Sequence, residues 1–270
     1  MTATTTTTNG SELAWALSDS AAMIGRSVRH GLRNTDALIM AVVLPVMMML
    51  LFVYVFGGAI NTGTQYVTYV VPGIILLCAS FGSATTAVSV CNDMVSGIVD
   101  RFRSMPIVSS AVLTGHVVAS VLRNLAAAAV VVGIGLLMGF RPSAGVFDWL
   151  GVFDWLGVIG LLALFVLAIS WVSAALGLLA RTPEAANGFT FGFLFLPYVS
   201  SAFVPTESMP SWLHAFAEHQ PVTPIIEAVR GLLTGAPVGN SWWLAVVWFG
   251  GITVVAHAAA AMIFNRRTAR

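Results

Sequence analysis

Long apolar stretches follow one another along almost the whole sequence, and they restrict the chain to very few folds. Six of them are long enough to cross a hydrocarbon core of about 30 Å, which takes about 20 helical residues. They lack the polar alternation of membrane-barrel strands, and backbone groups in lipid must be paired within the protein. We therefore expect an all-α integral membrane protein with six transmembrane helices, at residues 37–56, 67–90, 113–140, 158–180, 188–204 and 242–264.

The composition agrees with this expectation and excludes a large soluble domain. Of the 270 residues, 58% are hydrophobic and only 9% are charged, whereas about 25% are charged in soluble domains. The mean hydropathy of the chain is +0.90. Because the net charge is only +1 and no dense basic run occurs, we expect no nucleic-acid partner.

The positions of the arginines predict the orientation in the membrane. Arg141 follows the third predicted span and Arg230 follows the fifth, so both lie on the same side of the membrane. Most of the other arginines fall in the loops and ends on the opposite side. By the positive-inside rule, both ends of the chain then lie in the cytoplasm. The arginines expected at the cytoplasmic side are Arg26, Arg29, Arg33, Arg101, Arg103, Arg181, Arg266, Arg267 and Arg270.

Two regions outside the six spans carry helical patterns of their own. Residues 1–12 form a Thr-rich tract that we interpret as a disordered cytoplasmic tail, and residues 13–270 as a single transmembrane domain. Apolar residues recur at helical spacing over 13–28, which predicts an amphipathic helix on the inner leaflet; a solvated helix is the alternative. Residues 209–218 and 223–233 predict two short helices that dip into the outer leaflet or lie on it.

A perfect tandem copy, VFDWLG, occupies residues 146–151 and 152–157. A six-residue period matches neither a solenoid nor a heptad repeat. We interpret the copy as a local duplication in an outer loop, with Trp149 and Trp155 at the membrane interface.

No catalytic or metal-binding motif occurs in the sequence. All 12 basic residues are Arg, and an ATPase P-loop requires a Lys, so any ATP hydrolysis belongs to another chain. His257 lies within the last predicted span, where a proton relay or simple packing are the alternatives. Arg123 falls near the inner boundary of the third span and is expected to extend to the cytoplasm or to pair with an acid.

The cytoplasmic loop 91–110 combines charges with apolar and aromatic residues. Its sequence, CNDMVSGIVDRFRSMPIVSS, predicts a short amphipathic helix that ends at Pro106. This helix is either a connector on the inner surface or a docking element for a soluble partner.

Three stretches of the sequence resemble one known family. GIVDRFRSMP at 97–106 is similar to the segment after the second helix of type-2 ATP-binding-cassette exporter permeases, especially those of the daunorubicin/doxorubicin resistance group. The segment from Leu44-Pro45 to Phe56-Gly57-Gly58 agrees, as do MPSWLHAFAEHQP and AVRGLLTG between residues 209 and 235. The VFDWLG duplication departs from the family pattern.

The resemblance implies the permease subunit of an ATP-driven exporter in a bacterial plasma membrane, moving amphipathic or hydrophobic small molecules such as drugs, antibiotics or lipids outward. It implies two cytoplasmic ATPase subunits that hold ATP and Mg, a second permease copy in a homodimer or heterodimer, and no cofactor, metal or catalytic residue on this chain. An ion-coupled secondary transporter that uses a buried His is the alternative. The residues implied to contact the ATPase are Asp93, Gly97, Asp100, Arg101, Phe102, Arg103, Ser104, Met105 and Pro106. The candidates for the substrate route are Met49, Phe52, Phe81, Phe193 and Tyr198.

Overall fold

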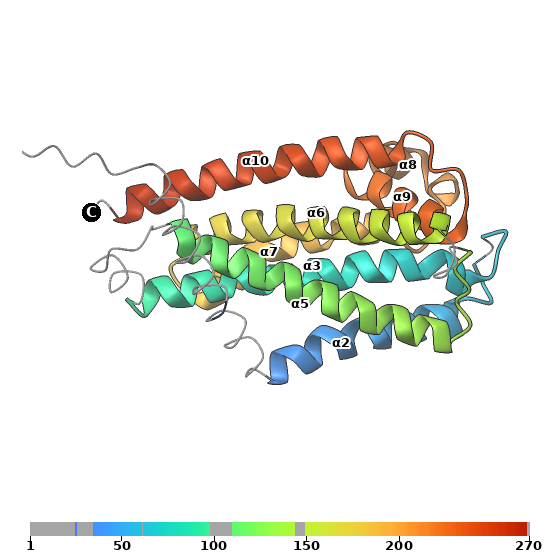
Figure 1. The fold of residues 1–270 in the computed structure, drawn as a ribbon, viewed down its shortest axis with the longest axis horizontal. Coiled ribbons are helices and arrows are strands. Elements are labelled where there is room, and N and C mark those ends of the chain that lie inside the picture. The colour runs from blue at the N-terminus through green and yellow to red at the C-terminus, as the bar shows by residue number, and fades with distance from the viewer. Residues whose placement is uncertain (1–24, 26–34, 61, 98–109, 144–148, 269–270) are drawn as a thin grey trace, which may run out of the picture.

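A computed structural model of the chain describes residues 25, 35–60, 62–97, 110–143 and 149–268. All regular structure in this part of the chain is helical, and the long helices lie side by side along one axis (Figure 1). The helices are α2 (Thr35–Leu50), η1 (Leu51–Phe56), α3 (Tyr66–Val95), α5 (Ser110–Leu137), α6 (Trp149–Leu179), α7 (Pro183–Leu194), η2 (Leu196–Val199), η3 (Thr206–Ser208), α8 (Ser211–His219), α9 (Val222–Thr234) and α10 (Ser241–Thr268).

Four helices, α3, α5, α6 and α10, are long and apolar enough to cross a membrane. They coincide with the second, third, fourth and sixth predicted spans, so the all-helical membrane class is confirmed. The first predicted span corresponds to α2 followed directly by the π-helical segment η1. Leu50 at their junction keeps helical angles, with φ −59 and ψ −46, so the chain continues without a break to Phe56.

The predicted fifth span is shorter than a full crossing. The helix α7 starts at Pro183 and ends at Leu194, whereas we expected a helix over 188–204. At 1.5 Å per residue, its 12 residues extend about 18 Å, less than the hydrocarbon core. Pro197, which has no backbone N–H to donate, lies in the separate 3₁₀ turn η2 that follows. The described residues therefore do not establish six complete spans.

The interpretation of the VFDWLG duplication as an outer loop is wrong for its second copy. Residues 152–157 lie entirely within α6, which begins at Trp149. Asp154 is the only charge over these turns, and Trp155 packs against the main hydrophobic core, so the copy extends an apolar helix. Residues 146–148 lie outside the described part of the chain.

The two short helices predicted between the fifth and sixth spans are confirmed as helices. α8 and α9 agree within two residues with the predicted 209–218 and 223–233. Gly235 ends α9 with φ 69, the left-handed conformation that favours glycine after a helix. Their insertion into the outer leaflet remains a prediction.

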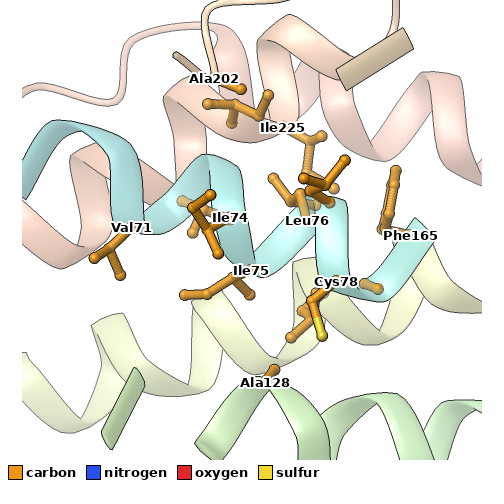
Figure 2. Packing of buried hydrophobic residues seen from close by; sticks show 14 of the residues in the cluster. Val71, Ile74, Ile75, Leu76, Cys78, Ala128, Phe165, Ala202 and Ile225 are labelled. Atoms are coloured by element: carbon orange, nitrogen blue, oxygen red, sulfur yellow. The ribbon is translucent and has the colours of Figure 1, made fainter. Parts of the chain in front are cut away.

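The main hydrophobic core surrounds α3. In its most apolar stretch 78% of residues are buried, against 17% in α10, so α3 is the central helix of the bundle. Figure 2 shows α3 side chains of this core between α5, α6 and the segment that includes α9. The labelled residues are Val71, Ile74, Ile75, Leu76, Cys78, Ala128, Phe165, Ala202 and Ile225.

Candidate functional site

Arg230 of α9 joins three segments at the end of the bundle that carries α8 and α9. Its Nη1 donates to Oε1 of Glu227 at 2.7 Å, its Nη2 to the carbonyl oxygen of Ser201 at 2.6 Å, and its Nε to that of Tyr69 at 3.3 Å. The guanidinium carbon also lies 3.8 Å from the centre of the Tyr69 ring, a cation–π contact. We call these four residues the Arg230 clamp. It connects α9 to the first turn of α3 and to the loop after η2.

A glycine in α3 allows this loop to lie directly on the helix. A Cβ atom on Gly73 would lie 2.7 Å from both the Cβ and the carbonyl oxygen of Ala202, closer than real Cβ atoms approach. The preceding residue, Pro72, has no N–H and removes one backbone hydrogen bond from the second turn of α3. The start of α3 is therefore closely packed but has fewer helical hydrogen bonds than an uninterrupted helix.

Two tyrosines of the first turn of α3 also hold the loop. The hydroxyl of Tyr66 donates to the carbonyl oxygen of Phe203 at 2.9 Å, and that of Tyr69 donates to the carbonyl oxygen of Ser201 at 2.9 Å. Nε2 of Gln220 donates to the carbonyl oxygens of the first and last residues of η2, Leu196 and Val199. Side-chain donors thus bind carbonyl oxygens of η2 and of the loop that follows it.

The held loop carries Phe203, whose ring lies between two residues predicted for the substrate route. Its centroid is 4.2 Å from that of Phe52 in η1 and 5.5 Å from that of Tyr198 in η2, and both pairs are stacked. We call Phe52, Phe203 and Tyr198 the aromatic stack. Phe203 itself was not among the residues predicted for the substrate route.

The other predicted route residues are dispersed. Met49 is fully buried in the main core, which indicates packing within one chain. Phe81 is half-buried and packs on the same core. Phe193 lies in α7, but its side chain is outside the described part of the structure.

At the opposite end of α3, Asp93 is paired with His116 of α5. Oδ2 of Asp93 lies 3.0 Å from Nε2 of His116, and both side chains are mostly buried, with 15% and 13% exposed. Gly97 follows the helix with φ 70, a conformation in which glycine is favoured, so the chain turns away there. The remaining predicted ATPase contacts, at 100–106, lie outside the described residues, as does the predicted helix at 13–28 apart from Gly25.

Polar contacts join the middle of α5 to α3 and to α6. Arg123 donates to the carbonyl oxygen of Gly82 at 3.1 Å and to Oγ1 of Thr85 at 2.9 Å, instead of to an acid. Nδ2 of Asn124 donates to the carbonyl oxygen of Ser120 at 2.8 Å, and the hydroxyl of Ser120 accepts a 2.9 Å bond from a serine of α6. Such contacts join helices in membranes, where apolar residues alone give little preference for a partner.

Within the described residues, no group of three or more His, Cys, Asp or Glu is placed to hold a metal ion. Cys78 and Cys91 are both buried thiols of α3. His257 is on α10, with its ring edge-on to Trp171 at a centroid distance of 4.4 Å. The arrangement offers helix-to-helix connections and an aromatic stack.

Sequence reasoning missed the residues with the most specific contacts. Arg230 was noted only for its place in the loops that carry few arginines, and its acceptors lie 161 and 29 residues away. His116 is 23 residues from Asp93. The only local signal was the pair Glu227 and Arg230, three residues apart on one helix face.

Comparison with known proteins identifies the family. Residues 20–234 match the ABC-2 type transporter family. The chain is 33% identical over 235 residues to the daunorubicin resistance ABC transporter permease protein DrrB1 of Streptomyces coeruleorubidus, covering 86% of this chain and 78% of that protein. It is 28% identical over 236 residues to the probable doxorubicin resistance ABC transporter permease protein DrrC of Mycobacterium tuberculosis, covering 87% and 83%. Together with the four long apolar helices, these matches show that the chain belongs to the ABC-2 type transporter family, as a multi-pass permease of the bacterial plasma membrane.

Proposed function

We propose that this chain is the membrane-spanning subunit of an ATP-driven exporter that moves amphipathic or hydrophobic small molecules out of the cell. The observation that carries the proposal is the match over most of the chain to permeases named for daunorubicin and doxorubicin resistance. Both drugs are amphipathic small molecules, with a flat ring system joined to a polar amino sugar, so the proposed substrate class follows from their chemistry.

The proposed topology places both chain ends and the junction between α3 and α5 in the cytoplasm, with α8 and α9 at the outer side. The distribution of arginines supports it. α6 and α10 both end on the side of the bundle opposite α8 and α9 (Figure 1). Arg181 follows the end of α6, and Arg266 and Arg267 lie in the last turn of α10. Positive residues gather at the cytoplasmic side of membrane proteins.

ATP hydrolysis is assigned to a separate ATPase subunit, which would hold ATP and Mg. The absence of Lys from the sequence supports this division. We place the ATPase contact at 97–106, directly after the end of α3. The pair of Asp93 and His116 joins the two helices that flank this segment, so a force on the segment would reach α3 and α5 together.

The proposed substrate route passes the aromatic stack and is completed by a second permease copy, identical or related. η1 and α7 support this arrangement because they leave large apolar side chains uncovered. These include Tyr54 and Val55 of η1 and Phe189 and Phe191 of α7. Uncovered apolar residues in a membrane face either lipid or another helix.

Transport by a reconstituted complex tests the proposal. The chain is purified from its host membrane with the ATPase that accompanies it, placed in lipid vesicles with the ATPase outside, and offered doxorubicin as the probe. Uptake that requires ATP, Mg²⁺ and both subunits is the expected result. Equal uptake by the chain alone refutes the proposal. Uptake that follows a proton gradient without ATP and disappears in His257→Ala would instead establish an ion-coupled transporter.

A further inference from the structure

The Arg230 clamp joins backbones and not only side chains. Two of the three hydrogen bonds from the guanidinium end on carbonyl oxygens, one in α3 and one in the loop after η2. A carbonyl oxygen cannot rotate away as a side chain can, so each bond fixes the path of the main chain itself. The planar guanidinium presents its donors in a rigid fork, which allows one side chain to hold two segments at once.

Burial distinguishes Arg230 from its acidic neighbour. The side chain of Arg230 is 12% exposed, whereas that of Glu227 is 41% exposed. Exposed ion pairs contribute little because water screens them. The bonds to the two carbonyl oxygens and the contact with the Tyr69 ring are therefore the main connections, and the bond to Glu227 is secondary.

The clamp acts on the helix that also reaches the opposite end of the bundle. α3 (Tyr66–Val95) runs from the end of the bundle that carries α9 to the end where α5 begins (Figure 1). Tyr69 lies in its first turn and Asp93 in its last, where it meets His116. Pro72 removes a helical hydrogen bond close to the clamp. Arg230 and the two tyrosines are thus among the contacts that hold the first turn of α3 in position.

We propose that Arg230 is a positioning residue that makes α8 and α9 follow the movement of α3, so that a displacement beside the ATPase contact shifts the outer helices and the Phe203 loop. The inference rests on the function proposed above. Without the clamp, α3 moves but the outer helices follow it only partly. ATP is then hydrolysed without a corresponding amount of substrate being exported.

The test measures two quantities in the same reconstituted complex: ATP hydrolysed and doxorubicin transported per assembled complex. Arg230→Met retains much of the apolar stem and removes every donor. We expect it to lower the doxorubicin transported per ATP by about fivefold or more, the size of a typical coupling between sites. Its ATP hydrolysis and its content of bound ATPase should stay close to those of the unaltered complex.

Three further variants separate the clamp from simple charge or stability effects. Arg230→Lys keeps the charge but lacks the fork, so its transport per ATP should fall nearly as far as in Arg230→Met. Glu227→Gln removes only the negative charge of the exposed partner and should retain most of the coupling. Arg141→Met is the matched control, since Arg141 is exposed and is also predicted at the outer side.

Each result decides one question. If the unaltered complex shows no ATP-dependent transport, the proposed function fails, whatever Arg230 does. If that complex transports and Arg230→Met keeps its transport per ATP, the clamp is refuted. A parallel fall of transport and ATP hydrolysis, loss of assembly in both Arg230 variants, or full coupling in Arg230→Lys also overturns the proposal, because Arg230 would then serve folding or charge alone.

Discussion

Gly177 provides a direct test of how closely α3 and α6 pack. A Cβ atom at this position would press on the carbonyl oxygen of Ala87 and would lie 3.0 Å from its carbonyl carbon and its Cα atom. All three are backbone atoms, so no side-chain rotation relieves the contact and the two helices must separate. Overpacking costs about 1–3 kcal/mol, and contact with backbone atoms alone favours the upper part of that range, about 2–3 kcal/mol. The better helix propensity of Ala returns about 1 kcal/mol. Gly177→Ala should thus lose about 1–2 kcal/mol of unfolding free energy.

The matched control for this substitution lies in the same helix. Gly160 is exposed and has no atom within 4 Å of an added Cβ, so Gly160→Ala should be neutral or slightly stabilising. Thermal unfolding of both purified variants in one detergent is the measurement, with a fall in Tm of about 2–8 °C expected for Gly177→Ala alone. Equal Tm values for the two variants would refute the close approach of α3 and α6.

Three other predictions concern the two ends of the bundle. Asp93→Ala should reduce ATP-dependent doxorubicin transport about fivefold, and the exchange Asp93→His with His116→Asp should restore part of it; no recovery would contradict a direct pair. Phe203→Ala removes a side chain that is 4% exposed and should lower the unfolding free energy by about 3–5 kcal/mol, measured against Phe203→Leu. Gly235→Ala places a side chain at φ 69 and 2.8 Å from Oγ of Ser143, so a loss of about 1–2 kcal/mol is expected, and unchanged Tm would exclude this conformation.

The sequence predicted those parts of the fold that depend on local patterns. Length and hydropathy located α3, α5 and α10, and proline and glycine signals gave the ends of α8 and α9 to within two residues. The same reasoning failed at the start of α6, because Trp, Gly and Asp in VFDWLG suit an interfacial loop as well as a helix. The fifth helix was predicted at 188–204, whereas α7 spans Pro183–Leu194. The apolar residues after Leu194 continue the hydrophobic pattern, but they form the separate turn η2 that contains Pro197.

Contacts between distant residues could not be read from the sequence. In the Arg230 clamp, two hydrogen bonds end on backbone carbonyl oxygens. Every residue has a carbonyl oxygen, so the residue types at these positions do not identify the acceptors. His116 and Asp93 become neighbours only once α3 and α5 are antiparallel. Phe203 is one of 16 Phe residues, and its place between Phe52 and Tyr198 follows from a loop conformation fixed by the tyrosines of α3.

Hydropathy also cannot tell which membrane helix is central. The most apolar stretches of α3 and α10 have the same mean hydropathy of 1.9, yet 78% of that stretch is buried in α3 and only 17% in α10. Lipid tails are as apolar as leucine, so burial in this protein follows from how closely helices can approach. α3 supplies small residues for that purpose, such as Gly73 against Ala202 and Ala87 against Gly177. α10 carries large exposed side chains, including Trp248, which suit contact with lipid or with a second subunit.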